Sequence, residues 1–525
     1  MSETTKTGII DIGSNSMRLV IYEYNERGIH RVIDEAKESA RLSERIDENG
    51  MLTPDGIRVA TDTLTHFRVL CEAAGVSRIR AVATAAIRNA AQSAAIVALL
   101  ERESGLSIEV LSGRDEARIG FLGMMNTLDI ESGYAIDIGG GSTELTLFVH
   151  RRIVHSVSFK FGAVQMAQLF GTGAGDAGQL AKMTQAVVAE AAKHSWIGAH
   201  HGLPMVGLGG TARSLCAIDQ RHKNYSMPVA HNYSMSGDDV RFMLNRLQSM
   251  SVEDRKQVDG LSKQRGDIIV PGAVILDTLF RLCGSTGYII SGAGLRDGLL
   301  ATMIGHEVPA ADEVLNRCVR HLLELHPNAA LAHLCQVNRF TLQLLEALHS
   351  KDGNHKPGHR SSHGGASREL QAARLDRVMH GASLLYKIGT TVNFYDFEKH
   401  TFYMIAHSRI YGLTHRETLL CACIASFKNK KRTRQLIARY PDLTDKQDVA
   451  FISKLGMLLQ LAVALDRSHT QPLAGVEASI RGKRLLLQAT ATRNAQIEQR
   501  QVAAIADDFA KEWALTPALE LMLPD

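Results

Sequence analysis

One short phrase occurs twice in this chain, and the repetition limits the possible folds more than any other feature of the sequence. The first copy reads DIGSNS at residues 11–16, and the second reads DIGGGSTE at residues 137–144. The copies align without a gap and begin 126 positions apart. Apolar runs enter and leave both turns, which is typical of a strand, a tight turn and a second strand. The repeat predicts a duplicated lobe, with the two turns facing each other across a cleft.

The small residues of the two turns indicate an anion site. Glycine and short hydroxyl side chains allow backbone N–H groups to converge, and converging N–H groups bind anions. An aspartate precedes each turn and would repel a phosphate, so we expect a cation between the carboxylate and the phosphate. A single turn of this kind is usually an ordinary hairpin. The two copies together predict a phosphate that is bound through magnesium.

The length and net charge of the chain are those of an ordinary globular protein with several domains. A chain of 525 residues is too long for one core and implies about three or four domains. The formal charge of +4 is small for this length and does not by itself indicate a nucleic-acid-binding protein. We expect no specific nucleic-acid partner. We also expect no membrane contact, because the sequence shows neither a signal peptide nor an apolar stretch long enough to span a bilayer.

The seven cysteines are spread along the chain without the spacing of a metal finger. Their mostly apolar surroundings favour reduced core thiols in a cytoplasmic protein. Cys421 and Cys423 are close enough in sequence for joint chemistry. On a helix, however, such positions diverge, so we favour a structural role for both.

Two further segments place charged residues at predicted strand ends. Arg88 follows a short apolar strand at residues 79–84, where it could grip a phosphate with two nitrogens or lie on the surface of the next helix. Asp115 and Glu116 follow a strand that breaks at Ser112, and both would occupy the first turn of a helix. Acids are common there because they offset the helix dipole. That explanation accounts for one acid and leaves the orientation of the other open.

Two later strand ends repeat the pattern of small residues before a helix. They read GLGGTAR at residues 207–213 and SGAGLRDG at residues 291–298. A turn of this type is either a further phosphate contact or merely a tight junction between a strand and a helix.

From about residue 311 the pattern changes to long helices, because leucines recur there at helical spacing. Residues 350–367 interrupt these helices with histidines among glycine, serine and asparagine. A metal site is conceivable in this segment, but we favour a solvated loop. The tail at residues 476–521 predicts the order strand, strand, helix, strand, which is a small α+β cap.

A basic tract follows one of the predicted helices. Residues 428–434 read KNKKRTR and carry five cations in seven positions. Such a run is usually a solvated surface. It could instead line the path of a long polyanion and release its counterions. Both interpretations stay open. The residues assigned to the path are Lys428, Lys430, Lys431 and Arg432.

Taken together, six ordered motifs resemble those of the exopolyphosphatase / guanosine pentaphosphate phosphohydrolase family. They lie at residues 11–16, 84–88, 112–118, 137–145, 207–214 and 291–299. The resemblance covers nearly the whole chain. It implies an α/β fold of the actin, sugar-kinase and heat-shock chaperone superfamily, with two duplicated ribonuclease-H-like lobes around a cleft. An all-α HD-like domain and a small α+β carboxyl-terminal domain would follow. The implied bounds are 1–125 for lobe I, 126–308 for lobe II, 309–472 for the helical domain and 473–525 for the last domain.

The resemblance also implies roles for individual residues. Glu116 matches the family's catalytic glutamate, a general base that deprotonates the attacking water. Asp11, Asp137 and Glu144 match acidic positions suited to Mg²⁺, and a monovalent cation such as K⁺ is a second candidate cofactor. These roles fit phosphoryl transfer, which depends on positioning and charge neutralisation. The residues expected to contact phosphate are Gly13, Ser14, Asn15, Ser16, Arg88, Gly139, Gly140, Gly141, Ser142, Thr143, Gly209, Gly210 and Thr211.

The helical domain resembles metal-dependent HD phosphohydrolases but lacks their metal-binding pair. Residues 385–389 read LYKIG where an active member has His-Asp. Tyrosine and lysine cannot replace that pair at a two-metal site, and Lys387 would repel the cations. His333 and Asp466 stand at the positions of outlying ligands. We expect this domain to bind and guide the substrate, or to dimerise, without hydrolysing anything.

These observations predict a cytoplasmic exopolyphosphatase, a phosphoric anhydride hydrolase that removes terminal orthophosphate from inorganic polyphosphate with the help of magnesium. The expected oligomer is a homodimer. The first alternative is hydrolysis of guanosine pentaphosphate to the tetraphosphate by the same residues. A phosphotransferase that uses ATP is the second alternative. A non-catalytic sensor of polyphosphate or nucleotides is the third.

Overall fold

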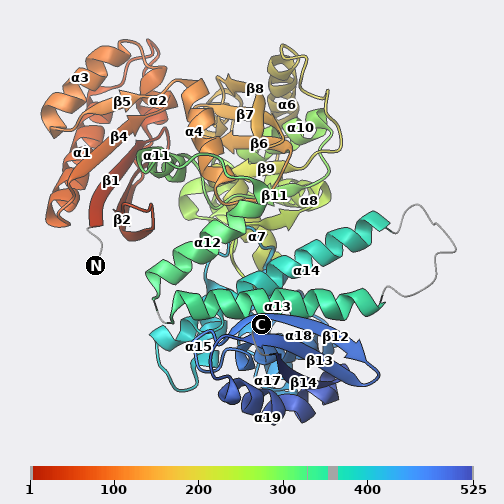
Figure 1. The fold of residues 1–525 in the computed structure, drawn as a ribbon. Helices are drawn as coiled ribbons and strands as arrows, with labels where there is room; N and C mark the ends of the chain where they lie inside the picture. The colour runs from red at the N-terminus through yellow and green to blue at the C-terminus, as the bar shows by residue number, and fades with distance from the viewer. Residues whose placement is uncertain (1–3, 328, 353–364, 523–525) are drawn as a thin grey trace. The chain divides into compact units, whose positions relative to one another are not determined.

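The computed structural model describes residues 4–327, 329–352 and 365–522 (Figure 1). The chain divides into two compact units, residues 1–314 and residues 315–525. The first unit holds both copies of the repeated phrase.

The first sheet contains the first copy of the phrase. Its strand order is β3-β2-β1-β4-β5, in which β1 pairs with β2 antiparallel and with β4 parallel. The strands are β1 (Thr4–Ile12), β2 (Met17–Asn25), β3 (His30–Glu38), β4 (Arg78–Ala83) and β5 (Ile108–Val110). The helical segments of this part are η1 (Leu42–Arg45), α1 (Pro54–Ala73), α2 (Ala85–Arg88), α3 (Ser93–Ser104) and α4 (Gly113–Met125). Thr53 caps α1 as its side chain accepts a hydrogen bond from the N–H of Gly56.

The second sheet repeats the plan of the first. Its order is β10-β11-β9-β6-β7-β8, with β6 antiparallel to β7 and parallel to β9. The strands are β6 (Gly133–Ile138), β7 (Thr143–Val149), β8 (Arg152–Phe159), β9 (Met205–Leu208), β10 (Tyr233–Met235) and β11 (Tyr288–Ile290). The helical segments are α5 (Ala163–Phe170), α6 (Ala177–Ala191), α7 (Gly209–His222), α8 (Gly237–Gln248), α9 (Val252–Arg255), η2 (Lys263–Arg265), α10 (Ile269–Cys283) and α11 (Leu295–Met303).

Strand order confirms the predicted duplication. Strands β6, β7 and β8 form a meander like that of β1, β2 and β3, and β9 and β11 take the places of β4 and β5. Strand β10 adds an antiparallel edge. The repeated phrase occupies the first turn of each meander, so both turns lie at the same end of their sheets. This topology confirms two ribonuclease-H-like lobes.

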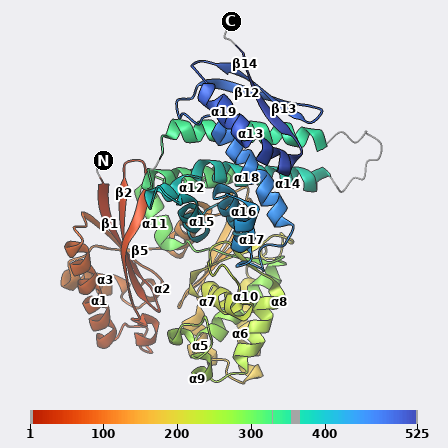
Figure 2. The same cartoon turned by 90° about the horizontal axis from the view of Figure 1, so that it is seen from below.

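Two helices join the cores of the lobes. Helix α11 follows β11 of the second sheet, yet Leu299 and Leu300 pack against Ile9 and Val82 of the first sheet. Helices α1 and α3 cover the opposite face of that sheet (Figure 2). Helix α4 contributes Ile119 to the same cluster as α11, while its later residues pack with the second sheet. The predicted bounds assigned α11 to lobe II, whereas its packing belongs to the first sheet.

Glycine permits the close crossing of α4 and α11. A Cβ atom on Gly123 would overlap the carbonyl oxygen of Gly294, and one on Gly298 would overlap that of Ile119. Arg151, whose side chain is buried, donates hydrogen bonds to the carbonyl oxygens of Met125 and Pro309. The crossing and this arginine fix the chain where it passes between the lobes.

The second unit is mainly helical and ends in a small sheet, as the sequence predicts. The boundary between the units falls within helix α12 (Ala311–Leu325), after Val314. The others are α13 (Leu331–Asp352), α14 (Gly365–Leu385), η3 (Ile388–Thr391), α15 (Phe397–His407), α16 (His415–Ala425), α17 (Lys430–Ile437) and α18 (Asp448–Ala464). The tail consists of β12 (Leu473–Arg481), β13 (Arg484–Ala491), α19 (Gln496–Trp513) and β14 (Thr516–Met522), in the sheet order β12-β13-β14.

Helices occupy both ends of the loop predicted at residues 350–367. Helix α13 continues to Asp352 and α14 begins at Gly365, so helical propagation from both sides takes up the ends of the segment. Residues 353–364, which include the histidines His355, His359 and His363, lie outside the described residues. Among the helices that are described, none combines the length and the apolar character needed to cross a bilayer.

The crossing of α4 and α11 generates a stability prediction. We expect Gly123→Ala to lower the free energy of unfolding by about 1–3 kcal/mol, because the added methyl group forces the two backbones apart. Gly120→Ala is the matched control in the same helix. A Cβ atom there meets nothing within 4 Å, so the better helix propensity of alanine should leave stability equal or higher by up to about 1 kcal/mol. The measurement is the midpoint of unfolding in urea, and equal midpoints for the two variants would contradict the tight crossing.

Candidate active site

The two copies of the repeated phrase meet face to face. A Cβ atom on Gly140 would lie 2.9 Å from the Cβ of Ser14, and one on Gly141 would lie 3.0 Å from the hydroxyl oxygen of Ser14. On the other side of the second turn, a Cβ atom on Gly162 would lie 2.5 Å from the backbone of Gly140. Side chains at Gly140 and Gly141 would separate the lobes, and one at Gly162 would displace the second turn from the start of α5. The glycines therefore set the distance between the two predicted phosphate cradles.

Backbone hydrogen bonds hold both turns in shape. The N–H groups of Ala163 and Val164, at the start of α5, donate to the carbonyl oxygens of Gly139 and Gly140 at 2.9 and 3.0 Å. In the first lobe, the N–H of Ser43 donates to the carbonyl oxygen of Ser14 at 3.1 Å. Because neighbouring segments take up these carbonyl groups, the turns are fixed before any ligand arrives.

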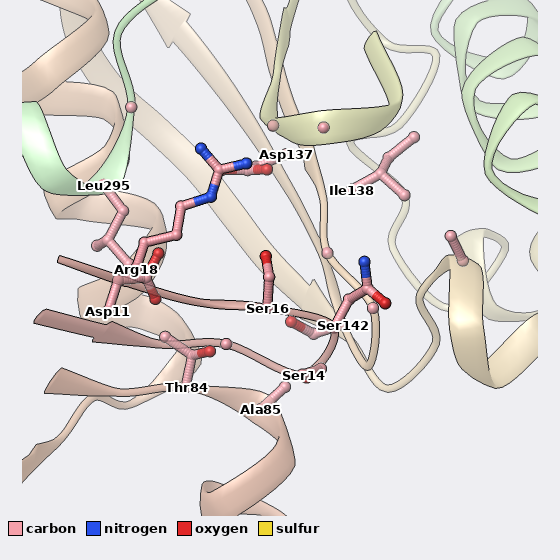
Figure 3. A pocket seen from close by; sticks show the side chains of 18 of the residues that line it. Asp11, Ser14, Ser16, Arg18, Thr84, Ala85, Asp137, Ile138, Ser142 and Leu295 are labelled. Atoms are coloured by element: carbon pink, nitrogen blue, oxygen red, sulfur yellow. The ribbon is translucent and has the colours of Figure 1, made fainter. Parts of the chain in front are cut away.

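A pocket lies between the turns and is lined by both lobes. Figure 3 shows Asp11, Ser16 and Arg18 entering it from the first lobe and Asp137 and Ser142 from the second. The predicted site residues that line it are Asp11, Gly13, Ser14, Asn15, Ser16, Glu116, Asp137, Gly139, Gly140, Ser142, Gly209 and Gly210. The repeated phrase supplies nine of these twelve residues.

Helix α4 aims Glu116 into the pocket. The hydroxyl of Ser112 accepts a hydrogen bond from the N–H of Asp115 and donates one to its carboxylate, so Asp115 is the acid that completes the helix start. The next residue, Glu116, lies on the side of the helix that faces the pocket. This resolves which of the two acids belongs to the cleft.

An arginine restrains Glu116. A guanidinium nitrogen of Arg88 donates to Oε2 of Glu116 at 2.6 Å and to the carbonyl oxygen of Leu111 at 3.0 Å. Both side chains of the ion pair are about five-sixths buried, with exposed fractions of 17% and 16%. Burial raises the pKa of Glu116 to about 7, against the opposing effect of Arg88. A carboxylate with a pKa near neutrality can take a proton from water and release it again.

The acids expected to bind metal are buried around the same point. Burial raises the pKa of Asp137 to about 6, and it also raises the pKa of Asp11 and, more strongly, that of Glu144. Glu144 accepts a hydrogen bond from Ser158 at 2.7 Å. A cavity of about 20 Å³, room for one water molecule, is lined by Glu116, Asp137 and Glu144.

This donor set fits a magnesium ion. No group of three or more His, Cys, Asp or Glu side chains close enough to share a metal occurs in the described part of the chain. Magnesium, however, usually binds through one or two carboxylates, several waters and the phosphates of the substrate. Asp11 and Asp137 line the pocket from opposite lobes, and their raised pKa values mark carboxylates whose charge a cation would stabilise.

Four arginines that the sequence analysis did not select also line the pocket. They are Arg18, Arg213, Arg265 and Arg296. Burial and the neighbouring arginines lower the pKa of Arg18 and of Arg265 to about 10. Like charges at such short range destabilise one another, and a polyanion between them would relieve the repulsion. The pocket is therefore suited to a ligand that carries several negative charges.

Three of these arginines could have been found from the motifs. Arg213 and Arg296 lie within the motifs at residues 207–214 and 291–299, and Arg18 lies two residues after the motif at residues 11–16. Arg18 stands directly opposite Asp11 in the β1–β2 ladder, and opposite residues of such a pair share a face. Arg213 lies one helical turn after Gly209, to whose carbonyl oxygen it donates at 2.9 Å. Arg296 opens α11. Arg265 has no such signal, because its loop between α9 and α10 carries no motif.

The pocket wall omits some predicted residues. Arg88 does not line the pocket itself but donates a hydrogen bond to Glu116, which does. Glu144 lines the small cavity of about 20 Å³ instead. Thr143 is buried and donates to the carbonyl oxygen of Phe161 at 2.8 Å. The remaining two, Gly141 and Thr211, lie behind the wall: Gly141 packs against Ser14, and Thr211 is 1% exposed.

The basic tract lies in the second unit. Asn429 caps α17, so Lys430, Lys431 and Arg432 form its first turn. Lys430 pairs with Glu512 of α19 at 2.9 Å. The role of this tract as a polyanion path stays a prediction.

A closed polar network occupies the place of the HD metal site in the second unit. Nδ1 of His333 lies 2.8 Å from Asp466, and its Nε2 lies 2.6 Å from the hydroxyl oxygen of Tyr386. Lys387 lies 3.1 Å from His469, which stacks on His333 with ring centroids 3.7 Å apart. Both nitrogens of His333 are thus engaged by side chains, which agrees with the interpretation of a degenerate site.

Sequence comparison matches both units to one family. A profile of the Ppx/GppA phosphatase family matches residues 20–307, and a profile of domain III of Ppx/GppA phosphatase matches residues 332–515. Exopolyphosphatase 1 of Mycobacterium tuberculosis (strain ATCC 25618 / H37Rv) is 25% identical over 307 residues, which make up 58% of this chain and 89% of that protein. Exopolyphosphatase 1 of Mycobacterium leprae (strain TN) is also 25% identical over 307 residues, 58% of this chain and 90% of that protein.

Solved structures match the lobes. The crystal structure of the Ppx/GppA family member from Aquifex aeolicus aligns with a TM-score of 0.50 at 25% identity, covering 57% of this chain and 98% of that one. An exopolyphosphatase from Cytophaga hutchinsonii ATCC 33406 aligns with a TM-score of 0.52 at 24% identity, covering 58% of this chain and 99% of that one. The second likeness supports the fold alone. Together with the strand order, these matches confirm the predicted fold class.

The position of Arg265 generates a prediction about anion binding. Its guanidinium lies against Gly210 so closely that a Cβ atom there would overlap it. We expect Gly210→Ala to push this flexible side chain aside and weaken the binding of inorganic triphosphate about tenfold, the value of one charge-assisted hydrogen bond. Arg265→Ala should weaken triphosphate binding by a similar factor, and the double variant Gly210→Ala/Arg265→Ala should bind no more weakly than either single variant. Isothermal titration calorimetry measures the dissociation constants; unchanged binding in Gly210→Ala would refute the placement.

Proposed function

Since the chain belongs to the Ppx/GppA phosphatase family, we propose that it is an exopolyphosphatase that hydrolyses the terminal phosphoanhydride bond of inorganic polyphosphate in a magnesium-dependent reaction. The observation that carries the proposal is Glu116, a buried carboxylate held by Arg88 at the edge of a pocket lined by two anion turns and four arginines. The mycobacterial relatives that carry the name exopolyphosphatase support the choice of substrate.

In the proposed reaction Glu116 acts as the general base. It orients a water molecule and accepts its proton while the water oxygen bonds to the terminal phosphorus. The bond from that phosphorus to the bridging oxygen breaks, and the shortened chain leaves with the bonding electrons and an added negative charge. The arginines and the N–H groups of the turns stabilise this charge at fixed positions, which lowers the barrier without reorganisation.

Magnesium would be held by Asp11 and Asp137, and it would neutralise the phosphate oxygens nearest to those carboxylates. Glu144 is too deeply buried to line the main pocket, so we assign it a supporting position behind Asp137. Arg88 restrains Glu116 and keeps its carboxylate aimed at the pocket.

Guanosine pentaphosphate is the competing substrate, because the motifs also resemble those of guanosine pentaphosphate phosphohydrolases. Its terminal phosphate would meet the same residues. Comparing kcat/KM for long polyphosphate and for guanosine pentaphosphate distinguishes the two functions. A ratio that strongly favours the nucleotide would overturn the choice of polyphosphate while leaving the catalytic assignment intact.

Replacing the base tests the mechanism. Glu116→Gln keeps the size of the side chain and loses the proton acceptor, so we expect kcat for orthophosphate release to fall about 100-fold or more. Polyphosphate affinity should stay within about threefold, because the turns and arginines that bind the chain are unchanged. Glu109→Gln, on the exposed end of β5, is the matched control and should behave as wild type. Near-normal turnover in Glu116→Gln would refute the role of the base.

The raised pKa of Glu116 predicts the pH profile. A general base works only when it is ionised, and its ionised fraction falls as the pH drops below the pKa. We therefore expect kcat/KM to decline below a pH of about 7, well above the ordinary glutamate value of 4.5. In Arg88→Gln the decline should begin at higher pH, because the charge of Arg88 holds the pKa of Glu116 down. An acidic limb near pH 4.5 in the wild type would contradict the buried environment.

A further inference from the structure

A set of hydrogen bonds crosses the cleft beside the pocket. Arg41 of the first lobe donates to Asp267 of the second at 2.8 Å and to the carbonyl oxygen of Gln264 at 2.9 Å. Ser39 donates to the side-chain oxygen of the same glutamine at 2.7 Å. We call Ser39, Arg41, Gln264 and Asp267 the cross-lobe bridge. None of the four lines the pocket.

The first-lobe side of this bridge is tied to a phosphate turn. The N–H of Arg41 donates to the carbonyl oxygen of Asn15 at 3.0 Å, and Arg41 adopts a left-handed backbone conformation with φ of 44°. Its guanidinium also binds Glu44 of its own lobe at 2.8 Å. Arg41 is thus oriented toward the cleft by its own lobe, and movement of the first turn would move it.

The second-lobe side of the bridge flanks a pocket arginine. Gln264 and Asp267 stand on either side of Arg265, whose guanidinium reaches the pocket over Gly210. Arg265 lies in the short η2 segment, which supplies few hydrogen bonds of its own. Behind this loop, the fully buried Arg255 donates to the carbonyl oxygen of Thr172 at 2.8 Å. Arg255 also donates to the carbonyl oxygen of Gly266 at 3.4 Å, so the second lobe itself anchors this loop, and the contacts from Arg41 to Gln264 and Asp267 add a restraint from the first lobe.

The bridge is too exposed to serve mainly as a source of stability. The side chains of Arg41 and Asp267 have exposed fractions of 29% and 27%, and ion pairs of this kind contribute little to folding. Their geometry is nevertheless specific, because one guanidinium joins a side-chain carboxylate and a backbone carbonyl on either side of Arg265. The bridge therefore fixes the position of the loop that carries Arg265 and contributes little to the stability of the fold.

We propose that Arg41 and Asp267 are positioning residues for anion binding, and that their contact across the cleft sets Arg265 against the substrate when the lobes are closed. Closing the lobes then also places Arg265 against the substrate. The proposal adds residues to the site of the proposed function and rests on it for the hydrolysis readout alone, since anion binding can be measured without turnover.

The sign of the charge change separates this proposal from simple electrostatics. Asp267→Asn removes a negative charge close to an anion site, so long-range electrostatics alone would strengthen the binding of inorganic triphosphate. The bridge predicts the opposite, a dissociation constant about tenfold higher, because Arg265 loses its fixed position. Arg41→Ala should weaken binding by a similar factor although its charge change is opposite.

The experiment is titration calorimetry of triphosphate into the full chain at constant ionic strength, with Arg265→Ala as the reference. If Arg41 acts through Arg265, the double variant Arg41→Ala/Arg265→Ala should bind no more than about threefold more weakly than Arg265→Ala alone. Arg58→Ala, which removes an exposed cation paired with Asp55 on α1, is the charge-matched control and should bind as wild type.

Three results would overturn the proposal. They are tighter binding in Asp267→Asn, unchanged binding in Arg41→Ala, and a double variant whose losses multiply to about 100-fold. Urea unfolding of each variant establishes that the fold is intact. If Arg41→Ala is less stable, the dissociation constant of Asp267→Asn tests the proposal in its place. If the wild type binds triphosphate but releases no orthophosphate from polyphosphate, the proposed function fails while the bridge is still tested by the binding constants.

Discussion

The architecture depends on how closely two peptide turns can approach when no side chains separate them. Gly140, Gly141 and Gly162 let the second turn pack between the first turn and the start of α5, and the lobes come into contact there. A β-carbon on Gly140 or Gly141 would move the two turns apart, and one on Gly162 would push the second turn away from the start of α5. Every distance across the pocket, including those between carboxylates and arginines on opposite lobes, follows from this steric limit.

That narrow contact brings together charges that would repel or attract strongly in the absence of a ligand. Carboxylates gather near Asp137, and four arginines converge from four different segments. Burial opposes ionisation of Asp11, Asp137 and Glu144 and of Arg18 and Arg265, and a polyanion with its cation would offset this electrostatic cost. Such preorganisation is what phosphoryl transfer requires, because little covalent chemistry is asked of the protein.

The sequence predicted the parts of the site that short segments encode. The repeated turns follow from patterns within about ten residues of one another, whereas the pattern left open which acid of α4 faces the cleft. Arg41 was missed because its partner Asp267 lies 226 positions away, and Arg265 because it meets Gly210 from a loop without a motif. Arg88 was expected at the phosphate and instead holds Glu116, a choice that depends on the distance between α2 and α4. The positions of these three arginines depend on packing between segments that are distant in the sequence, so no local sequence pattern predicts them.

Helix α11 carries a consequence for how the chain acquires its structure. It emerges from the second sheet but supplies Leu299 and Leu300 to the core of the first. While the protein is being synthesised, one face of the amino-terminal sheet is covered only in part, by α4, until residue 303 has left the ribosome. The two lobes therefore finish folding together, even though one is translated well before the other, and neither is an autonomous folding unit in the order in which the gene is read.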